Sequence, residues 1–223
     1  MVRIKICGLM SSEDVDVCAR SGAHTVGFVV DYPTPVPWNL TAAKAKELIM
    51  NTPPFVSTCV VTGGSVEKVL KTVHETLPNI VQLHYKESLQ EVKEITRQCK
   101  LIGIKVIKAL RMSRNGNCDF ELQNPAEAVK ELSKTGIAAI LIDSFSEALP
   151  GGTGMTVDLS VFRKLQQGCP MPLILAGGLN PKNITSILHN VSPYGVDILT
   201  GVEEKPGLKD PEKIRSFIES VNL

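Results

Sequence analysis

The chain has 223 residues, and its 24 Lys and Arg residues against 23 Asp and Glu residues give a formal net charge of +1. This balance gives no electrostatic basis for binding nucleic acid or an anionic membrane surface. Hydrophobic residues make up 43% and charged residues 21%, a composition typical of a globular protein that excludes wholesale disorder. No window approaches the roughly 18 consecutive apolar residues of a membrane-spanning helix. The N-terminal residues carry charge in their first apolar run and do not form a secretory signal.

Short, β-branched apolar runs alternate along the chain with amphipathic stretches. We expect strands at residues 3–7, 25–30, 55–61, 80–83, 105–110, 138–142, 172–175 and 195–199. Between them the spacing of apolar residues predicts helices at residues 12–21, 41–51, 65–76, 88–98, 125–135, 159–167, 181–189 and 211–221. The strand runs are continuously apolar, which is typical of parallel strands that helices cover.

Several of the predicted helices begin with residues that favour a helix start. The expected N-caps are Ser11, Thr41, Ser65 and Asn124, and the prolines suited to a first turn are Pro125, Pro181 and Pro211. Eight strand–helix units in 223 residues leave about 28 residues per unit, a little less than is usual for a barrel. The sequence therefore predicts an α/β protein folded as a single (β/α)8 TIM barrel domain over residues 1–223. An open doubly wound sheet is the alternative.

The cysteines bear on the compartment of the protein. There are six, none of them in a Cys-x-x-Cys pair, so their spacing gives no zinc or redox motif. Cysteines scattered in this way are typical of free thiols in a reducing compartment, and we expect a cytoplasmic protein.

In a barrel of this kind, the active site forms at the C-terminal ends of the strands. Polar residues and glycines that end the predicted strands are therefore the candidates for the site. They are Lys5, Cys7, Gln82, His84, Lys108, Arg111, Asp143, Gly177, Gly178, Thr200 and Gly201.

The glycine turns after the last two strands predict a phosphate site. Gly177-Gly178 and Thr200-Gly201 occupy these turns, where backbone N–H groups can converge on a phosphate. Ordinary tight turns also use glycine, so each turn alone is weak evidence. Neither turn matches a GxGxxG or P-loop motif, and a nucleotide is not indicated.

Three residues could carry acid–base chemistry, and each also allows a structural interpretation. Cys7 is either a buried small hydrophobic residue or a thiolate, which needs partial exposure and a nearby cation. Lys5 shares its inward face by alternation and could supply that cation. Asp143 is either a turn cap or a general acid, and His84 is either structural or functional.

Several motifs, in order along nearly the whole chain, resemble the phosphoribosylanthranilate isomerase family of tryptophan biosynthesis. The main ones are Lys5-Ile6-Cys7-Gly8, Gln82-Leu83-His84, Leu141-Ile142-Asp143-Ser144, Gly151-Gly152-Thr153-Gly154, Leu175-Ala176-Gly177-Gly178-Leu179-Asn180-Pro181-Lys182-Asn183, and Gly195-Val196-Asp197 through Gly201-Val202-Glu203.

The resemblance implies a (β/α)8 barrel, monomeric or homodimeric, that needs no metal or cofactor and rearranges a phosphorylated sugar amine. Asp143 would be the general acid that opens the sugar ring, and Cys7 the general base that removes the C2′ proton. The matched glycines, including Gly154, would hold the substrate phosphate. Lys5, His84 and Arg111 are the remaining candidates for substrate binding.

One departure from the family pattern concerns the substrate carboxylate. The family has an Arg after the second strand that holds this carboxylate, whereas this chain has Val36. A lost charge-assisted contact of this kind is worth about 1.5–3 kcal/mol. Either Arg111 or Arg114 replaces the anchor, or the chain is a paralogue that isomerises another phosphorylated sugar. A phosphate-ligand-binding barrel without catalysis is the third alternative. Trp38, the one tryptophan of the chain, could cover the aromatic part of the substrate or pack on the surface.

Overall fold

The computed structural model describes residues 1–113, 115–144 and 158–223. Two of the candidate residues, Arg114 and Gly154, lie outside these ranges.

Eight parallel strands form a closed barrel. They are β1 (Arg3–Ile6), β2 (Thr25–Val30), β4 (Ser57–Thr62), β5 (Ile80–Leu83), β6 (Lys105–Met112), β7 (Ala139–Ser144), β8 (Leu173–Leu175) and β9 (Gly195–Ile198). Each strand pairs with its neighbours in chain order, and β1 pairs with both β9 and β2, which closes the sheet. The predicted (β/α)8 barrel is confirmed, and the open sheet is excluded.

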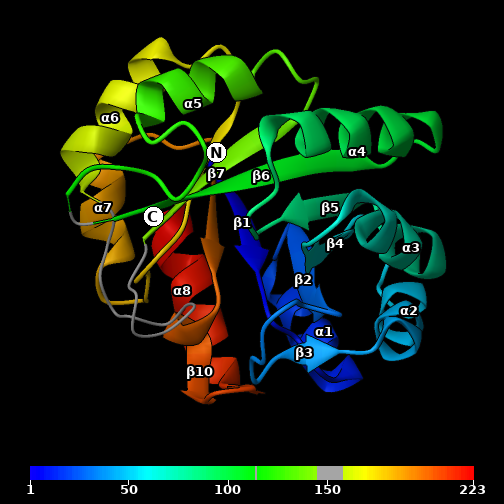
Figure 1. Ribbon diagram of the computed structural model, residues 1–223. Helices are drawn as coiled ribbons and strands as arrows, with labels where there is room; N and C mark the ends of the chain where they lie inside the picture. Colours follow the sequence, from blue (N-terminus) through cyan, green and yellow to red (C-terminus); the bar gives the residue numbers. More distant parts are fainter. Residues whose placement is uncertain (114, 145–157) are drawn as a thin grey trace.

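Helices surround the strands (Figure 1). They are α1 (Ser12–Ser21), α2 (Ala42–Met50), α3 (Val66–Thr76), α4 (Leu89–Leu101), α5 (Pro125–Leu132), α6 (Leu159–Gly168), α7 (Ile184–Asn190) and α8 (Pro211–Asn222). The four expected N-caps are confirmed, because each side chain accepts a hydrogen bond from a backbone N–H of the first turn. No helix within the described ranges is both long and apolar enough to cross a membrane.

Two predicted boundaries were wrong for reasons that the backbone shows. The strand expected at 55–61 begins at Ser57, because Phe55 adopts a left-handed φ of 71° that interrupts extended backbone. The helix expected at 181–189 begins at Ile184, so Pro181 is not in its first turn. The side chain of Asn180 accepts hydrogen bonds from the backbone N–H groups of Lys182 and Asn183, which favours a turn there over helix.

Four short elements were not predicted, and they lie on the loops at the C-terminal end of the barrel. β3 (Asn39–Leu40) pairs with β2, and η1 (Thr200–Val202) is a single 3-10 turn after β9. β10 (Glu203–Lys205) and β11 (Leu208–Lys209) then form an antiparallel pair before α8. These elements order the loops that follow β2 and β9.

The core has two parts, because side chains of the strands alternate between the helices and the barrel interior. The outer part is aliphatic and includes Ile4, Ile6 and Val26 against the helices. The interior is filled by two groups of apolar side chains, which are Ile107, Ala109, Ala139, Leu141 and Ala176, and Cys7, Val29, Trp38, Cys59 and Val61. Full burial of each large aliphatic side chain contributes about 1.5–3 kcal/mol. This packing gives the loops above it a rigid base.

Candidate active site

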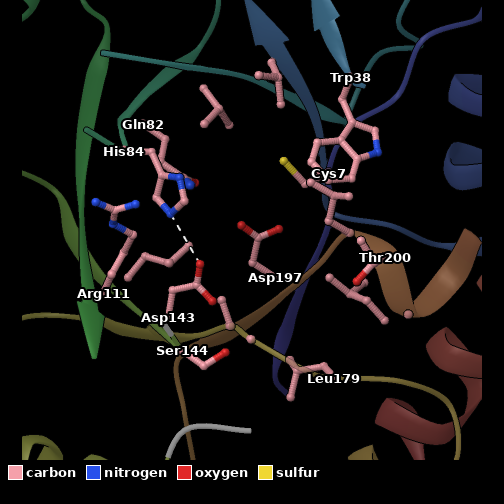
Figure 2. Close-up of a pocket in the computed structure, with 18 of the residues that line it drawn as sticks. Cys7, Trp38, Gln82, His84, Arg111, Asp143, Ser144, Leu179, Asp197 and Thr200 are labelled. Carbon is pink, nitrogen blue, oxygen red and sulfur yellow. Dashed lines mark ion pairs between the residues drawn. The ribbon is translucent and has the colours of Figure 1, made fainter. Parts of the chain in front are cut away.

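A pocket of about 920 Å³, open to solvent, lies at the C-terminal ends of the strands. Every barrel strand or the loop that follows it contributes to the pocket wall, as expected for this fold. Figure 2 shows Cys7 and Asp143 extending into the pocket from different sides, with Asp197 between them. The two residues predicted to carry acid–base chemistry therefore face one cavity.

Cys7 is placed by the end of β1 and by the strand beside it. Its backbone N–H donates to the Ile198 carbonyl at 2.8 Å, which continues the pairing with β9. Gly27 on β2 makes room for the side chain, since a Cβ there would lie 2.9 Å from the Cys7 Sγ and 3.0 Å from the Lys5 Cε. The thiol, Lys5 and this glycine are thus packed together.

Lys5 forms a buried ion pair with Asp197, with 2.6 Å between the Nζ and Oδ2 atoms. Asp197 lines the pocket, whereas Lys5 lies behind it and does not. Burial acts to lower the pKa of Lys5, but the negative groups around it, the Asp197 carboxylate first among them, together outweigh burial and the net pKa is raised. Lys5 is therefore a fixed cation next to the thiol.

The Cys7 thiol is 4% exposed, less than its sequence context predicted for a reactive cysteine. Burial raises the pKa of Cys7, and the Lys5 ammonium partly offsets this. Cys7 is consequently protonated near neutral pH, and its thiolate depends on positive charge close by.

Asp143 ends β7 and faces His84, which follows β5. The His84 Nε2 lies 3.3 Å from the Asp143 Oδ2, and both side chains line the pocket (Figure 2). Tyr32 fixes the histidine backbone, because its hydroxyl donates to the His84 carbonyl at 2.7 Å. Burial raises the pKa of Tyr32 to about 12, so this hydroxyl keeps its proton near neutral pH. His84 and Asp143 thus form an ordered pair.

Arg111 and Lys108 lie on the same strand but on opposite faces of it. Arg111 lines the pocket and pairs with the Asp119 carboxylate. Lys108 is turned away from the pocket and pairs with the buried Glu87, with 2.7 Å between Nζ and Oε2. Of the two cations expected after this strand, only Arg111 can reach a ligand in the cavity.

The predicted phosphate-site glycines lie together at one end of the pocket. Gly177 and Gly178 have φ values of 86° and 63°, which only glycine adopts at low cost. Gly201 touches the neighbouring loop, since a Cβ there would lie 1.9 Å from the Leu179 carbonyl oxygen. Thr200 begins η1 and also lines the pocket. Asn183 secures this arrangement by donating to the Gly178 carbonyl at 2.9 Å.

Two buried polar side chains of the pocket wall were not assigned a role from the sequence. Gln82 and Asp197 are 3% and 7% exposed, and the Gln82 Oε1 and Asp197 Oδ1 have no hydrogen-bond partner among the described residues. A buried oxygen without a partner is costly, which is expected where a ligand supplies the partner. Gln82 was among the strand-end candidates without a role, whereas Asp197 lies within β9 and was not one of them. Asp197 lies in one of the motifs that resemble the family, and its alternation with Leu199 directs it toward the barrel interior.

The fold and the pocket define the class of protein: a (β/α)8-barrel enzyme with an acid, a cysteine and two glycine loops around one cavity. The family model for N-(5'phosphoribosyl)anthranilate (PRA) isomerase matches residues 4–220. The chain belongs to this family.

Individual relatives agree in length and fold. An N-(5'-phosphoribosyl)anthranilate isomerase of Pelodictyon phaeoclathratiforme is 37% identical over 227 aligned positions, covering 99% of this chain and 98% of the relative. One of Methanosarcina acetivorans is 35% identical and covers 98% and 92%. The crystal structure of phosphoribosyl anthranilate isomerase from Thermotoga maritima superposes with a TM-score of 0.83 at 31% identity, covering 100% and 99%. A second structure, at a TM-score of 0.80 and 31% identity, holds reduced 1-(o-carboxyphenylamino)-1-deoxyribulose 5-phosphate and covers the same shares.

Proposed function

We propose that this chain converts N-(5'-phosphoribosyl)anthranilate into 1-(o-carboxyphenylamino)-1-deoxyribulose 5-phosphate, an aldose-to-ketose rearrangement. The observation that carries the proposal is that Cys7 and Asp143 line the same pocket as the glycine loops. The cavity thereby offers an acid, a base and a phosphate site to one small substrate.

Asp143 is the general acid of the first step. Its carboxyl group gives a proton to the ring oxygen of the ribose, the bond from that oxygen to C1′ breaks, and an iminium cation forms between C1′ and the nitrogen. The His84 Nε2, 3.3 Å from the Asp143 Oδ2, supports this role by orienting the carboxyl group.

Cys7 is the general base of the second step. As a thiolate it removes the proton from C2′, and the electron pair of that bond neutralises the iminium to give an enolamine. Protonation at C1′ and loss of the C2′ hydroxyl proton then complete the ketose. Burial raises the pKa of Cys7, and Lys5 together with the iminium cation supplies the positive charge that favours the thiolate.

The remaining candidates bind the charged ends of the substrate. Gly177, Gly178, Thr200 and Gly201 hold the phosphate, supported by their meeting at one end of the pocket. Arg111 binds the anthranilate carboxylate. The place of its guanidinium group in the pocket wall supports this role.

Three broader expectations belong to the same proposal. Residues 1–223 act as one barrel domain, the enzyme is cytoplasmic, and it is a monomer or a homodimer. A structure of the Thermotoga maritima relative describes that protein as dimeric, with monomers generated from it, which supports either state for this fold.

The decisive experiment is complementation of a tryptophan auxotroph that lacks this isomerase. Growth without tryptophan is expected from the wild-type gene and not from a Cys7→Ala, Asp143→Ala double variant. No growth with soluble, folded wild-type protein would point instead to the paralogue with another phosphorylated sugar as substrate.

A further inference from the structure

Trp38 lies where an aromatic group of a ligand would rest. It is buried at 6% exposure, yet it lines the pocket next to Cys7 (Figure 2). Around it the pocket wall is apolar, and it includes Val29, Val36, Val61 and Leu199. We refer to these four residues and Trp38 as the apolar wall.

The indole ring is held from behind by a buried charged group. Its Nε1–H donates to the Glu203 Oε1 at 2.7 Å, and the same oxygen lies 2.8 Å from the Lys209 Nζ. Glu203 and Lys209 are 7% and 4% exposed, so the indole is bound to a desolvated ion pair. Figure 2 shows the indole nitrogen turned away from Asp143 and Asp197. The carbon edge of the ring therefore faces the cavity.

The β2 and β4 part of the apolar wall lies away from the Gly177-Gly178 turn, whereas Leu199 adjoins the Thr200-Gly201 turn. Val29 and Val61 come from β2 and β4, and in the closed sheet β4 lies across the barrel from β8, which precedes Gly177. A substrate with its phosphate at the glycine loops and C2′ at Cys7 therefore directs the group on C1′ toward the β2 and β4 side.

We propose that Trp38 contacts the aromatic ring of the substrate and sets the preference for an aryl amine, with Glu203 as the residue that positions the indole. The inference rests on the proposed function, and it identifies the residues that contact and select the aryl group. Apolar and aromatic surface favours an aromatic ring over an aliphatic or charged group. Contacts of this kind form in both the ground and the transition state, so their loss raises KM more than it lowers kcat.

Trp38 is the only tryptophan of the chain, so contact can be measured directly. The probe is reduced 1-(o-carboxyphenylamino)-1-deoxyribulose 5-phosphate, added to the wild-type protein and followed by nuclear magnetic resonance. We expect nuclear Overhauser effects between the aryl protons of the probe and the indole ring protons, and no shift of the indole resonances with inorganic phosphate alone. A saturated complex without these effects would overturn the proposal. Because the readout needs binding and not turnover, it is independent of whether the chain isomerises phosphoribosylanthranilate.

Kinetics of variants test the assignment of roles. Trp38→Ala is expected to raise KM at least about tenfold with kcat within about threefold, whereas Trp38→Phe, which keeps an aromatic ring but loses the hydrogen bond to Glu203, should raise KM less. Glu203→Ala should raise KM in the same way, and Glu203→Gln, which can still accept from the indole, should restore it in part. The matched control is Glu87→Ala, since Glu87 is a similarly buried partner of a lysine but accepts from the Gly64 and Tyr85 backbone and not from Trp38. An unchanged KM in Trp38→Ala, or an equal rise of KM in Glu87→Ala, would contradict the proposal. If Trp38→Ala does not fold, Trp38→Phe and the resonance experiment decide.

Discussion

The Lys5 ammonium lies 2.6 Å from the Asp197 carboxylate, and Lys5 packs beside the Cys7 thiol behind the pocket wall, which Asp197 lines. Lys5 brings a positive charge close to a cysteine whose pKa burial raises, and it partly offsets that rise. We therefore expect Lys5 to act on the reaction through Cys7, as a positioning residue.

Replacing Lys5 by Met should shift the pH profile of kcat/KM. Lys5 lowers the pKa of Cys7, so its removal raises that pKa, and activity that depends on the thiolate should begin at higher pH than in the wild type. Lys5→Arg keeps the charge and should bring the profile back toward the wild type. A profile of Lys5→Met that coincides with the wild type would show that Lys5 has a structural role only.

Stability complicates this test in a predictable way. A buried carboxylate without its partner costs about 3–5 kcal/mol, so Lys5→Met should unfold at lower temperature. The double variant Lys5→Met, Asp197→Asn removes the unpaired charge and should recover much of that loss. Because Lys5 affects the pKa of Cys7 more strongly than Asp197 does, its pH profile should still begin at higher pH.

Cys7→Ser and Asp143→Asn should each lower kcat by about 10²- to 10⁴-fold, the usual contribution of a general acid or base. The measurement is kcat of each purified variant with the substrate. Cys59→Ser is the matched control, because Cys59 is also a buried cysteine of the barrel interior but does not line the pocket. Near-normal turnover in both active-site variants would mean that the assigned mechanism is wrong.

The barrel and most of the site could be predicted because they depend on local signals. Continuous apolar runs mark parallel strands, and Cys7, Asp143 and Gly177 mark the strand ends that face the pocket. Asp197 could not be recognised in this way, because its role depends on Lys5, which is 192 residues away along the chain. The ion pair exists only once β1 and β9 have closed the sheet.

The depth at which Cys7 is buried could not be predicted from the sequence either. Cys7 was expected to be partly exposed if reactive, yet the apolar wall and Gly27 enclose it. The start of α7 was predicted too early, because side-chain hydrogen bonds of Asn180 compete with the helix signal of Pro181. In both cases contacts outside the local pattern decided the outcome.

Gly201→Ala should weaken substrate binding through the phosphate loops. The added Cβ would lie 1.9 Å from the Leu179 carbonyl oxygen, so one of the two loops must move. We expect a loss of stability of about 1–3 kcal/mol, as for other overpacked sites, and a rise of KM. Gly168→Ala in α6, where the Cβ meets nothing within 4 Å, is the control and should leave KM unchanged. An equal KM in both variants would place the phosphate elsewhere.

Buried thiols should make the folded state less stable at alkaline pH. Burial raises the pKa of Cys18 and of Cys59 to about 12, from a usual value of 9.0. A raised pKa contributes stability that is complete below the unfolded value and is lost as pH rises toward the folded value. The melting temperature under reducing conditions should therefore fall from about pH 9 upward, and Cys18→Ala should fall less steeply over that range. Parallel curves for the two proteins would argue against thiol ionisation as the cause.

Arg111→Ala tests whether this residue binds the substrate carboxylate in place of the missing anchor at Val36. A charge-assisted contact of about 1.5–3 kcal/mol corresponds to a rise of KM of roughly ten- to a hundredfold. Arg111→Lys should recover only part of the loss, because an ammonium cannot form the two parallel hydrogen bonds of a guanidinium. Asp119→Asn separates this effect from the ion pair with Asp119, since it keeps the guanidinium and removes its charged partner. If Arg111 binds the carboxylate, Arg111→Ala should not raise KM for a phosphoribosyl aniline, which lacks that carboxylate. An equal rise of KM for both substrates would assign Arg111 to another part of the substrate.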